Sequence, residues 1–153
     1  MKKIENILKV ERIHDLVAVK KDDVLEEMCK MVANAPEVTS PEALRKSIRA
    51  REAIMSTGIG MGIAIPHAKI ASVQDFVMAI GRSKEGVDFQ SLDGMPVNVI
   101  ILIVASDTQG EDFLRVLSKI GKFFLNHENK DKIVAASGPE EIFSLFKEID
   151  SLT

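Results

Sequence analysis

The sequence lacks several residues and patterns that mark common classes of protein. Its 153 residues include a single cysteine, Cys29, and neither tryptophan nor tyrosine. One cysteine excludes an intrachain disulfide, which fits a reducing compartment. The segment VLEEMCKMV around it has the pattern of a helix, where a cysteine serves as a small hydrophobic residue.

Charge of one sign and long apolar runs are also scarce. The net charge is −3, and no cluster of Lys and Arg has the density of a nucleic-acid-binding arm. Charged residues at Glu5, Lys9 and Glu11 interrupt any signal peptide, and no later apolar run approaches the length of a membrane span. We therefore expect a cytoplasmic protein with no nucleic-acid partner and no membrane insertion.

The length and the hydrophobic pattern predict one domain, 1–153, of the α/β class. Strands are predicted at 13–19, 62–67, 75–84 and 95–106, and helices at 20–35, 41–55, 107–126 and 139–149. The run MPVNVIILIVAS at 95–106 is almost continuously apolar, which is typical of a strand covered on both faces. We expect a sandwich in which a central mixed sheet is flanked by helices.

Local signals mark two of the helix starts. Ser40 precedes Pro41 and Ser137 stands two residues before Pro139, so we expect both serines to open helices. Of the three histidines, His14 falls at the start of a predicted strand and His127 in the polar stretch NHENKDK. Neither has neighbours that suggest a role, and both are interpreted as surface or packing residues.

The most informative stretch is STGIGMGIAIPHAK, residues 56–69, in which Gly58, Gly60 and Gly62 alternate before His67. A dinucleotide-binding loop requires the spacing G-x-G-x-x-G between a strand and a helix, whereas here a helix precedes and a strand follows. A nucleotide phosphate loop requires Lys and Ser or Thr after its last glycine, and the sequence has Ile and Ala there. A plain connection that needs glycine for its backbone conformation remains an alternative.

This stretch could bind an anion beside a nucleophile. Without side chains at the glycines, the backbone amides can approach a phosphate closely, and the hydroxyl groups of Ser56 and Thr57 can add donors. An imidazole with a pKa near its usual value of about 6.5 is a competent nucleophile at neutral pH, so His67 suits phosphoryl transfer to nitrogen. Arg49 and Arg51 lie just upstream, and a purely structural histidine is the alternative.

No metal and no cofactor is expected at this site. In-line phosphoryl transfer needs a positioned nucleophile and donors around three oxygens, which amides and a guanidinium can supply. A metal-dependent hydrolase is a poor alternative because His67 has no H-x-x-x-H partner or Cys/His cluster nearby in the sequence.

At these residues the sequence resembles a known family. REAIMSTGIGMGIAIPHAK is similar to the signature of the fructose/mannitol-type enzyme IIA domain of the bacterial phosphoenolpyruvate-dependent phosphotransferase system, and especially to its nitrogen-regulatory branch. The later segments VDFQSLDGMPVNVIILIVAS and DFLRVLSKIGKFF are also similar in order and spacing. The resemblance implies an α/β sandwich that accepts a phosphoryl group from the histidine-containing phosphocarrier protein and passes it to enzyme IIB, or uses it as a regulatory signal.

The resemblance also implies roles for individual residues. His67 would carry the phosphoryl group, Arg51 would balance its charge, and Thr57 would donate to it. Arg51 could instead lie along a helix face, and the Thr57 hydroxyl could instead bond nearby backbone.

One position departs from the family pattern, because Phe113 stands where many members carry a second histidine. Asp112 or backbone amides could compensate for it. Alternatively, the domain could be a binding module with weak or no phosphorylation that controls a transporter, a kinase or a transcription regulator.

Overall fold

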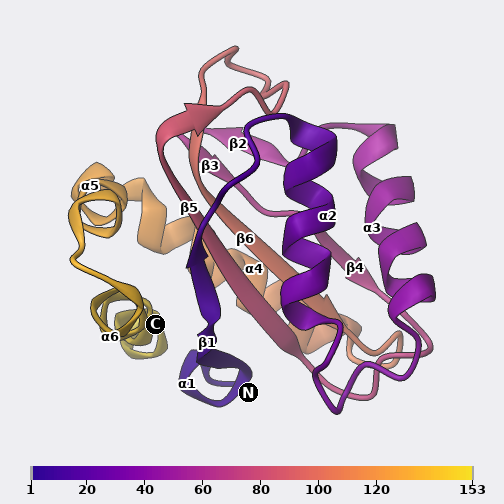
Figure 1. The fold of residues 1–153 in the computed structure, drawn as a ribbon. Helices are drawn as coiled ribbons and strands as arrows, with labels where there is room; N and C mark the ends of the chain where they lie inside the picture. Colours follow the sequence, from indigo (N-terminus) through magenta and orange to yellow (C-terminus); the bar gives the residue numbers. More distant parts are fainter. Residues whose placement is uncertain (1, 153) are drawn as a thin grey trace.

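The computed structural model describes residues 2–152, which form one mixed sheet with helices on both of its faces (Figure 1). The helices are α1 (Ile4–Ile7), α2 (Lys21–Val32), α3 (Pro41–Ile54), α4 (Gly110–Leu125), α5 (His127–Ala135), α6 (Pro139–Lys147) and the short 3₁₀ helix η1 (Glu148–Ser151). The strands are β1 (Leu8–Asp15), β2 (Gly58–Gly60), β3 (Ile63–Ala64), β4 (His67–Lys69), β5 (Val77–Val87) and β6 (Val97–Ala105).

The sheet is organised around β6. The strand order is β1-β5-β6-β3-β2, and β4 also pairs with β6. β5 runs antiparallel to β6, whereas β3 and β4 both run parallel to it, with Ile63 opposite Val99 and His67 opposite Ile103. β3 and β4 therefore pair with successive parts of β6, like one strand that is interrupted. Ile65 and Pro66 separate them, and a proline has no amide hydrogen for a ladder bond.

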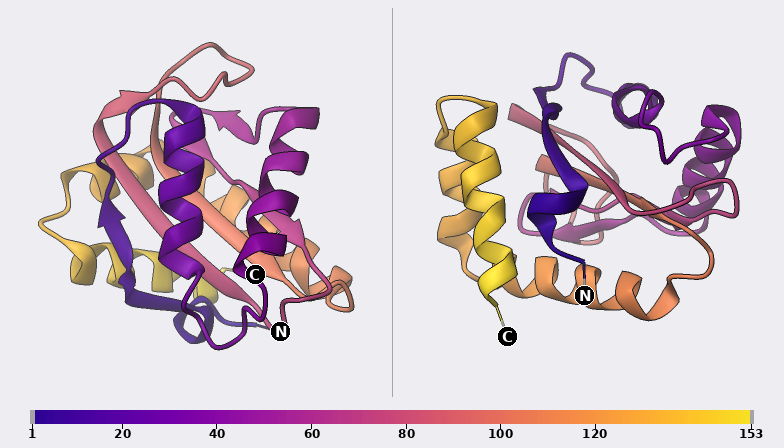
Figure 2. Two further views of the ribbon diagram at one scale, coloured as in Figure 1. Left: turned by 45° about the vertical axis from the view of Figure 1, so that its right-hand side comes forward. Right: turned by 90° about the horizontal axis from the view of Figure 1, so that it is seen from below.

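Helices cover the sheet in two layers. α2 and α3 lie on one face, and α4, α5 and α6 lie on the other, as the view from below shows (Figure 2). Alternate residues of β6 belong to two separate hydrophobic clusters. Ile100 and Leu102 face α2 and α3, whereas Val99, Ile101 and Ile103 face the C-terminal helices. The expectation of a central strand covered on both faces, and of a sandwich flanked by helices, is confirmed.

Cys29 lies in the cluster under α2, where it is 6% exposed. Burial raises the pKa of its thiol to about 11, so the thiol stays protonated at neutral pH and behaves as the small hydrophobic residue that the sequence predicts.

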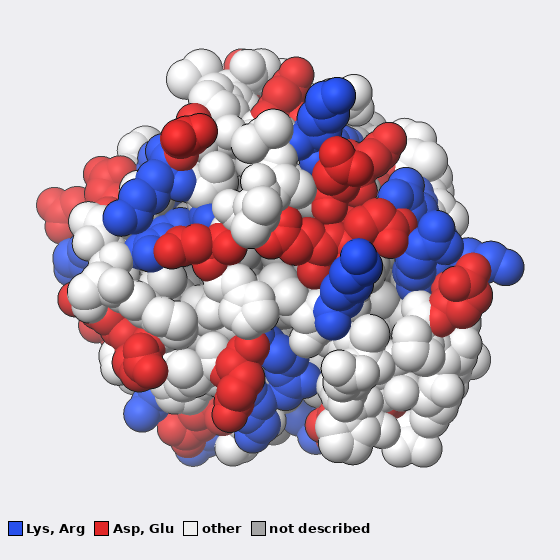
Figure 3. Space-filling view, viewed as in Figure 1, with Lys and Arg blue, Asp and Glu red and all other residues white. Residues whose placement is uncertain are grey.

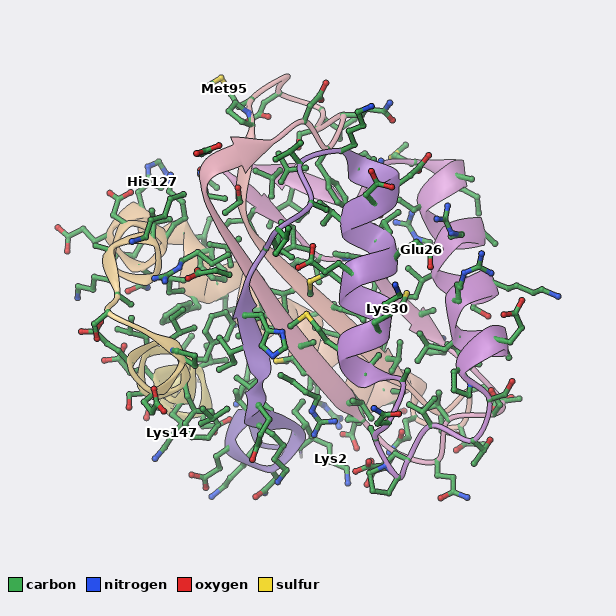
Figure 4. The ribbon with its side chains drawn as sticks, viewed as in Figure 1. Lys2, Glu26, Lys30, Met95, His127 and Lys147 are labelled. Atoms are coloured by element: carbon green, nitrogen blue, oxygen red, sulfur yellow. The ribbon has the colours of Figure 1, made fainter. Side chains whose placement is uncertain are left out.

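The layer of α2 and α3 is tied together on its outer side by charge. Glu26 of α2 accepts hydrogen bonds from Nε of Arg45 at 2.8 Å and from Nε of Arg49 at 2.7 Å, both on α3, and these bonds lower its pKa. Figure 4 shows Glu26 between the two helices, and Figure 3 shows acidic and basic side chains interspersed over them. Arg49 is thereby engaged with α2 rather than with His67.

The first strand lies earlier than predicted: β1 spans Leu8–Asp15 instead of 13–19. The chain after Asp15 leaves the sheet, and the backbone amides of Val17 and Ala18 donate to the Glu27 carboxylate of α2 rather than to a neighbouring strand. Val17 is 88% exposed, so its apolar side chain gave a misleading strand pattern.

The C-terminal region differs from the prediction in two ways. α5 forms in the polar stretch for which no helix was predicted. The Asn126 side chain caps it by accepting from the amide of Glu128, and Ile133 is fully buried. Ser137 does not cap the last helix; Gly138 holds the N-cap position, and the Ser137 amide donates to the Glu141 carboxylate. Ser40, in contrast, caps α3 as predicted by accepting from the amide of Ala43.

A buried arginine holds α5 against the sheet. Arg82 of β5 is 3% exposed, and its Nε lies 2.6 Å from Oδ1 of Asp15 on β1. Its Nη1 donates to the carbonyl oxygens of Ile133 at 3.1 Å and Ala136 at 2.6 Å, at the C-terminal end of α5. A cation is favoured at this end of a helix dipole, so one side chain joins the edge strand β1, its neighbour β5 and the helix α5.

We expect Arg82→Met to lower the free energy of unfolding by about 2–3 kcal/mol, because buried carbonyl groups of α5 lose their donor while the aliphatic volume is kept. Urea unfolding followed by circular dichroism measures this loss. Arg115→Met is the matched control: Arg115 pairs with Asp112 on the surface of α4, and its removal should cost no more than about 0.5 kcal/mol. Equal losses in the two variants would contradict this account of Arg82.

Candidate functional site

His67 is the first residue of β4, held in one orientation by the backbone just before it. Its Nδ1 lies 2.7 Å from the carbonyl oxygen of Ile65. A carbonyl oxygen can only accept a hydrogen bond, so Nδ1 carries the proton, and a neutral imidazole then has its lone pair on Nε2. The sequence placed His67 at the end of a strand; the structure instead interrupts the strand at Pro66 and starts a new one at the histidine.

The half-buried imidazole lines a surface hollow of about 520 Å³. β4 pairs only with β6 among the described strands, so it forms an edge of the sheet. α3 contributes Arg51 and Ile54 from one side of this edge, and α4 contributes Phe113 and Leu114 from the other. The histidine is thus accessible at the rim where the two helical layers meet.

Arg51 is the predicted site residue that the structure brings to the same hollow as His67. Its Nη1 donates to the carbonyl oxygen of Met55, 2.8 Å away, just beyond the end of α3. No other partner of Arg51 is found among residues 2–152, and a guanidinium has five N–H groups. Arg51 therefore retains donors for an anion at His67.

Ser56 and Thr57 do not line the hollow. Thr57 is buried, and its amide and hydroxyl donate to the Glu52 carboxylate at 2.8 and 2.5 Å. The Ser56 hydroxyl donates to the carbonyl oxygen of Phe89 at 2.9 Å. Both hydroxyl groups already have acceptors inside the protein, so a direct role as phosphate donors stays a prediction.

The three glycines lie in a hairpin and at its turn. β2 (Gly58–Gly60) pairs antiparallel with β3, and Gly60 and Gly62 have φ of 93° and 81° at the turn, where glycine is favoured. A Cβ at Gly58 would lie 2.2 Å from Oγ of Ser91. Amides of this stretch are also used: Gly58 donates to Ser56 and Met61 donates to Asp93. The glycines here shape the turn and its close packing, and phosphate binding by this stretch stays a prediction.

Phe113 of α4 lies beside His67, with ring centroids 5.7 Å apart and planes tilted by 49°. It is buried and also contacts Phe76. Asp112, the suggested substitute for a second histidine, instead accepts a hydrogen bond from Arg115 at 3.1 Å. One side of the imidazole is therefore hydrocarbon, with no hydrogen-bond donor.

The rim of the hollow is apolar and exposed. Ile54 of α3 is 80% exposed and Leu114 of α4 is 68% exposed. Both line the hollow of His67.

Two charged residues at or near the site were not identified from the sequence. Lys69 lines the hollow, on the same side of β4 as His67, because residues two apart in a strand share a face. This alternation along a strand is the signal in the sequence that could have identified Lys69. Glu52 follows Arg51 directly, but its contact with Thr57 depends on how the chain turns after α3, which no local pattern specifies.

The other two histidines lie apart from this site. The ring of His14 is hydrogen-bonded to the carbonyl oxygen of Glu11 on the surface, and His127 stands on α5 at the outside of the molecule (Figure 4). Among residues 2–152, no group of three or more His, Cys, Asp or Glu side chains is placed to hold a metal ion. No helix in the same range is long and apolar enough to cross a membrane.

Fold and site together define a class of protein: an α/β sandwich that presents an accessible histidine, next to cationic groups, at an open edge of its sheet. Residues 6–149 match the family model described as phosphoenolpyruvate-dependent sugar phosphotransferase system, EIIA 2. The chain belongs to this family of phosphoryl-carrier components.

Individual relatives support this membership. The chain is 36% identical over 130 residues to the fructose-specific EIIABC component of Bacillus subtilis, covering 85% of this chain and 20% of that protein. The structure of the nitrogen regulatory protein IIA-Ntr from Neisseria meningitidis has a TM-score of 0.88 at 29% identity, with 94% of this chain and 98% of that chain covered. In fold alone, the chain is similar to the mannitol enzyme IIA in its complex with phosphorylated enzyme IIB from Escherichia coli, with a TM-score of 0.80, 18% identity, and 92% and 97% of the two chains covered.

The close packing of Gly58 against Ser91 predicts that a larger residue at position 58 clashes with Ser91, and that a smaller residue at position 91 relieves the clash. We expect Gly58→Ala to lower the free energy of unfolding by about 1–3 kcal/mol, because the new methyl group meets Ser91. Adding Ser91→Gly removes the nearest atoms and should restore part of the loss. Urea unfolding of the single and double variants measures both effects.

Gly121→Ala is the control, because nothing lies within 4 Å of a Cβ there and alanine favours a helix. It should leave stability unchanged or slightly raised. If Gly58→Ala is as stable as the wild type, the packing account of this glycine is wrong.

Proposed function

We propose that His67 accepts a phosphoryl group on Nε2 from a histidine-containing phosphocarrier protein in the cytoplasm. The phosphoryl group then passes to an enzyme IIB or serves as a regulatory signal of the nitrogen-regulatory kind. The observation that carries this proposal is the hydrogen bond from Nδ1 to Ile65, which leaves the Nε2 lone pair for the reaction. Family membership and the resemblance to both sugar-specific and nitrogen-regulatory relatives support it.

The proposed exchange balances without a metal or a cofactor. The Nε2 lone pair of His67 attacks phosphorus, a new P–N bond forms, and the P–N bond to the carrier's histidine breaks with its electron pair returning to that nitrogen. The ring of His67 gains positive charge and keeps its Nδ1 proton, while the carrier's ring loses positive charge. The carbonyl oxygen of Ile65 stabilises the developing imidazolium through the bond it already accepts.

Cationic side chains would balance the charge of the phosphoryl oxygens. Arg51 and Lys69 line the same hollow as His67. A guanidinium offers paired donors to phosphate oxygens, and an ammonium acts as a point charge. In this proposal the residues before the histidine have an indirect role, because they fix the hairpin that leads to it: Ser56, Thr57, Gly58, Gly60 and Gly62.

The apolar rim suits docking of a partner protein. Ile54 and Leu114 are exposed beside a buried phenylalanine, so a partner would cover hydrocarbon around the reacting nitrogen and exclude water from it. A phosphoryl group on His67 adds negative charge at this rim. Binding of a partner that fits the apolar rim should therefore depend on the phosphorylation state.

We expect one phosphoryl group, about 80 Da by general chemistry, on the wild type after incubation with phosphoenolpyruvate, enzyme I and the phosphocarrier, and none on His67→Ala. Intact-mass spectrometry at neutral pH measures it, since acid hydrolyses phosphohistidine. His14→Ala and His127→Ala are matched controls that should label fully. A wild type that takes up no phosphate, or a His67→Ala that does, would refute the proposal.

The second candidate function is a regulatory binding module with weak or absent phosphorylation. Phe113 favours it, because its ring occupies one side of the imidazole without offering a donor. Such a module would bind a transporter, a kinase or a transcription regulator through the same rim. Partner binding by His67→Ala at wild-type strength, with an unlabelled wild type, would favour this candidate.

Phe113→His separates the two candidates. A histidine there would place a donor near the phosphoryl oxygens, so we expect labelling about tenfold faster than in the wild type. The buried polar ring should also lower the free energy of unfolding by about 1–3 kcal/mol. Phe113→Leu is the control, with no new donor and no gain in rate. Labelling only in Phe113→His would identify a binding module that has lost transfer, and equal rates in all three proteins would remove any role for this position.

A further inference from the structure

The structure contains a buried ion pair that the proposed transfer does not use. Glu52, in the last turn of α3, is 6% exposed, and one of its carboxylate oxygens lies 2.9 Å from Nζ of Lys21 on α2. The Lys21 ammonium also lies 4.7 Å from the ring centre of Phe89. A carboxylate near the C-terminal end of a helix is disfavoured by the helix dipole, and burying an ion pair is costly. Such a conflict with local preference often marks a residue with a functional task.

Glu52 is the start of a chain of hydrogen bonds that ends at His67. Its carboxylate accepts from the amide and the hydroxyl of Thr57 at 2.8 and 2.5 Å. The carbonyl oxygen of Thr57 accepts from the amide of Ile65 at 3.0 Å. The carbonyl oxygen of Ile65 then accepts from Nδ1 of His67 at 2.7 Å. Four short contacts thus connect α3, the start of the hairpin and the interruption between β3 and β4.

The hydrogen bonds from Glu52 to His67 pass through the gap between β3 and β4, where the ladder to β6 is interrupted. Ile65 lies outside both β3 and β4, and its amide is bound by Thr57 rather than by the ladder to β6. The next residue, Pro66, anchors the segment to β6 only through its carbonyl oxygen, which accepts from Ile103 at 3.0 Å. The position of the Ile65 carbonyl, and with it the orientation of the imidazole, therefore depends on Thr57.

We propose that Glu52 is a positioning residue for His67: by holding Thr57 it fixes the Ile65 carbonyl, which selects the Nδ1–H tautomer and aims Nε2 into the hollow. The consequence for phosphoryl transfer rests on the proposed function. The tautomer selection itself does not, because it is a property of the unphosphorylated protein.

The test is the tautomer of His67 in Glu52→Gln. Glutamine keeps the size but removes the charge that pairs with Lys21, and it replaces one of the two oxygens that accept from Thr57 by an NH2 group, which cannot accept. Long-range ¹H–¹⁵N spectra of the imidazole, recorded above the titration of the ring, give the tautomer ratio. We expect the Nδ1–H form to dominate in the wild type and its ratio to the other tautomer to fall about fivefold or more in Glu52→Gln.

Two further variants keep the test decisive. If Glu52→Gln does not fold, Thr57→Val removes one link with little change in shape and should shift the ratio in the same direction, by less. Ile48→Val is the matched control, because it weakens the buried face of α3 without touching the chain of bonds. An unchanged ratio in a folded Glu52→Gln or Thr57→Val, or an equal shift in Ile48→Val, overturns the proposal.

Transfer kinetics separate this proposal from the one it rests on. With the phosphocarrier as donor, Glu52→Gln should lower kcat about tenfold with little change in KM, since a misoriented nucleophile still docks its partner. A wild type that never labels, combined with a shifted tautomer in the variant, refutes the proposed function and leaves the positioning role supported. Normal labelling with an unchanged tautomer refutes the positioning role alone.

Discussion

The parallel pairing of β3 and β4 with β6, broken at Pro66, is the constraint on which the site depends. β6 is buried on both faces, so it lies in the middle of the sheet and its register is fixed by both hydrophobic clusters. The pairing of His67 with Ile103 sets the position of β4 along β6. Because the break removes ladder bonds just before the histidine, a carbonyl that would otherwise pair with a strand is available to the imidazole. His67 is thus anchored by a strand that is buried on both faces, while its ring lies at an open edge.

The layers around the sheet are held by polar contacts as well as by hydrocarbon. Arg82 binds the carbonyl end of α5, Glu26 joins α2 to α3, and Glu52 joins both helices to the hairpin. Each contact links separate elements, and those of Arg82 and Glu52 also satisfy buried polar groups. The two helical layers are therefore positioned relative to β4 by more than packing, which matters because Arg51 and Phe113 reach the histidine from different layers.

The sequence predicted the elements whose signals are local. The apolar run of β6, the serine cap of α3 and the stripe of α2 all follow from residues within a few positions of one another, and His67 was singled out by its own neighbours. What failed depends on contacts across the chain. α5 is stabilised by Arg82 from β5, the start of the glycine stretch is fixed by Ser91 and Glu52, and the chain after β1 is captured by Glu27. The residues of those segments do not indicate such distant partners, so the hairpin could not be predicted from the glycine spacing.

The apolar and cationic side chains around His67 affect which partners could bind the protein with and without a phosphoryl group. Phe113 and the exposed side chains of Ile54 and Leu114 make the neutral site an apolar surface with two cations at its rim. A phosphoryl group would convert it into a charged surface that a partner must desolvate, so the two states should favour different partners. A donor at position 113 would stabilise the charged state and reduce this contrast. A phenylalanine there keeps the contrast large, which suits a protein whose phosphorylation state is read by partners as well as one that only passes the group on.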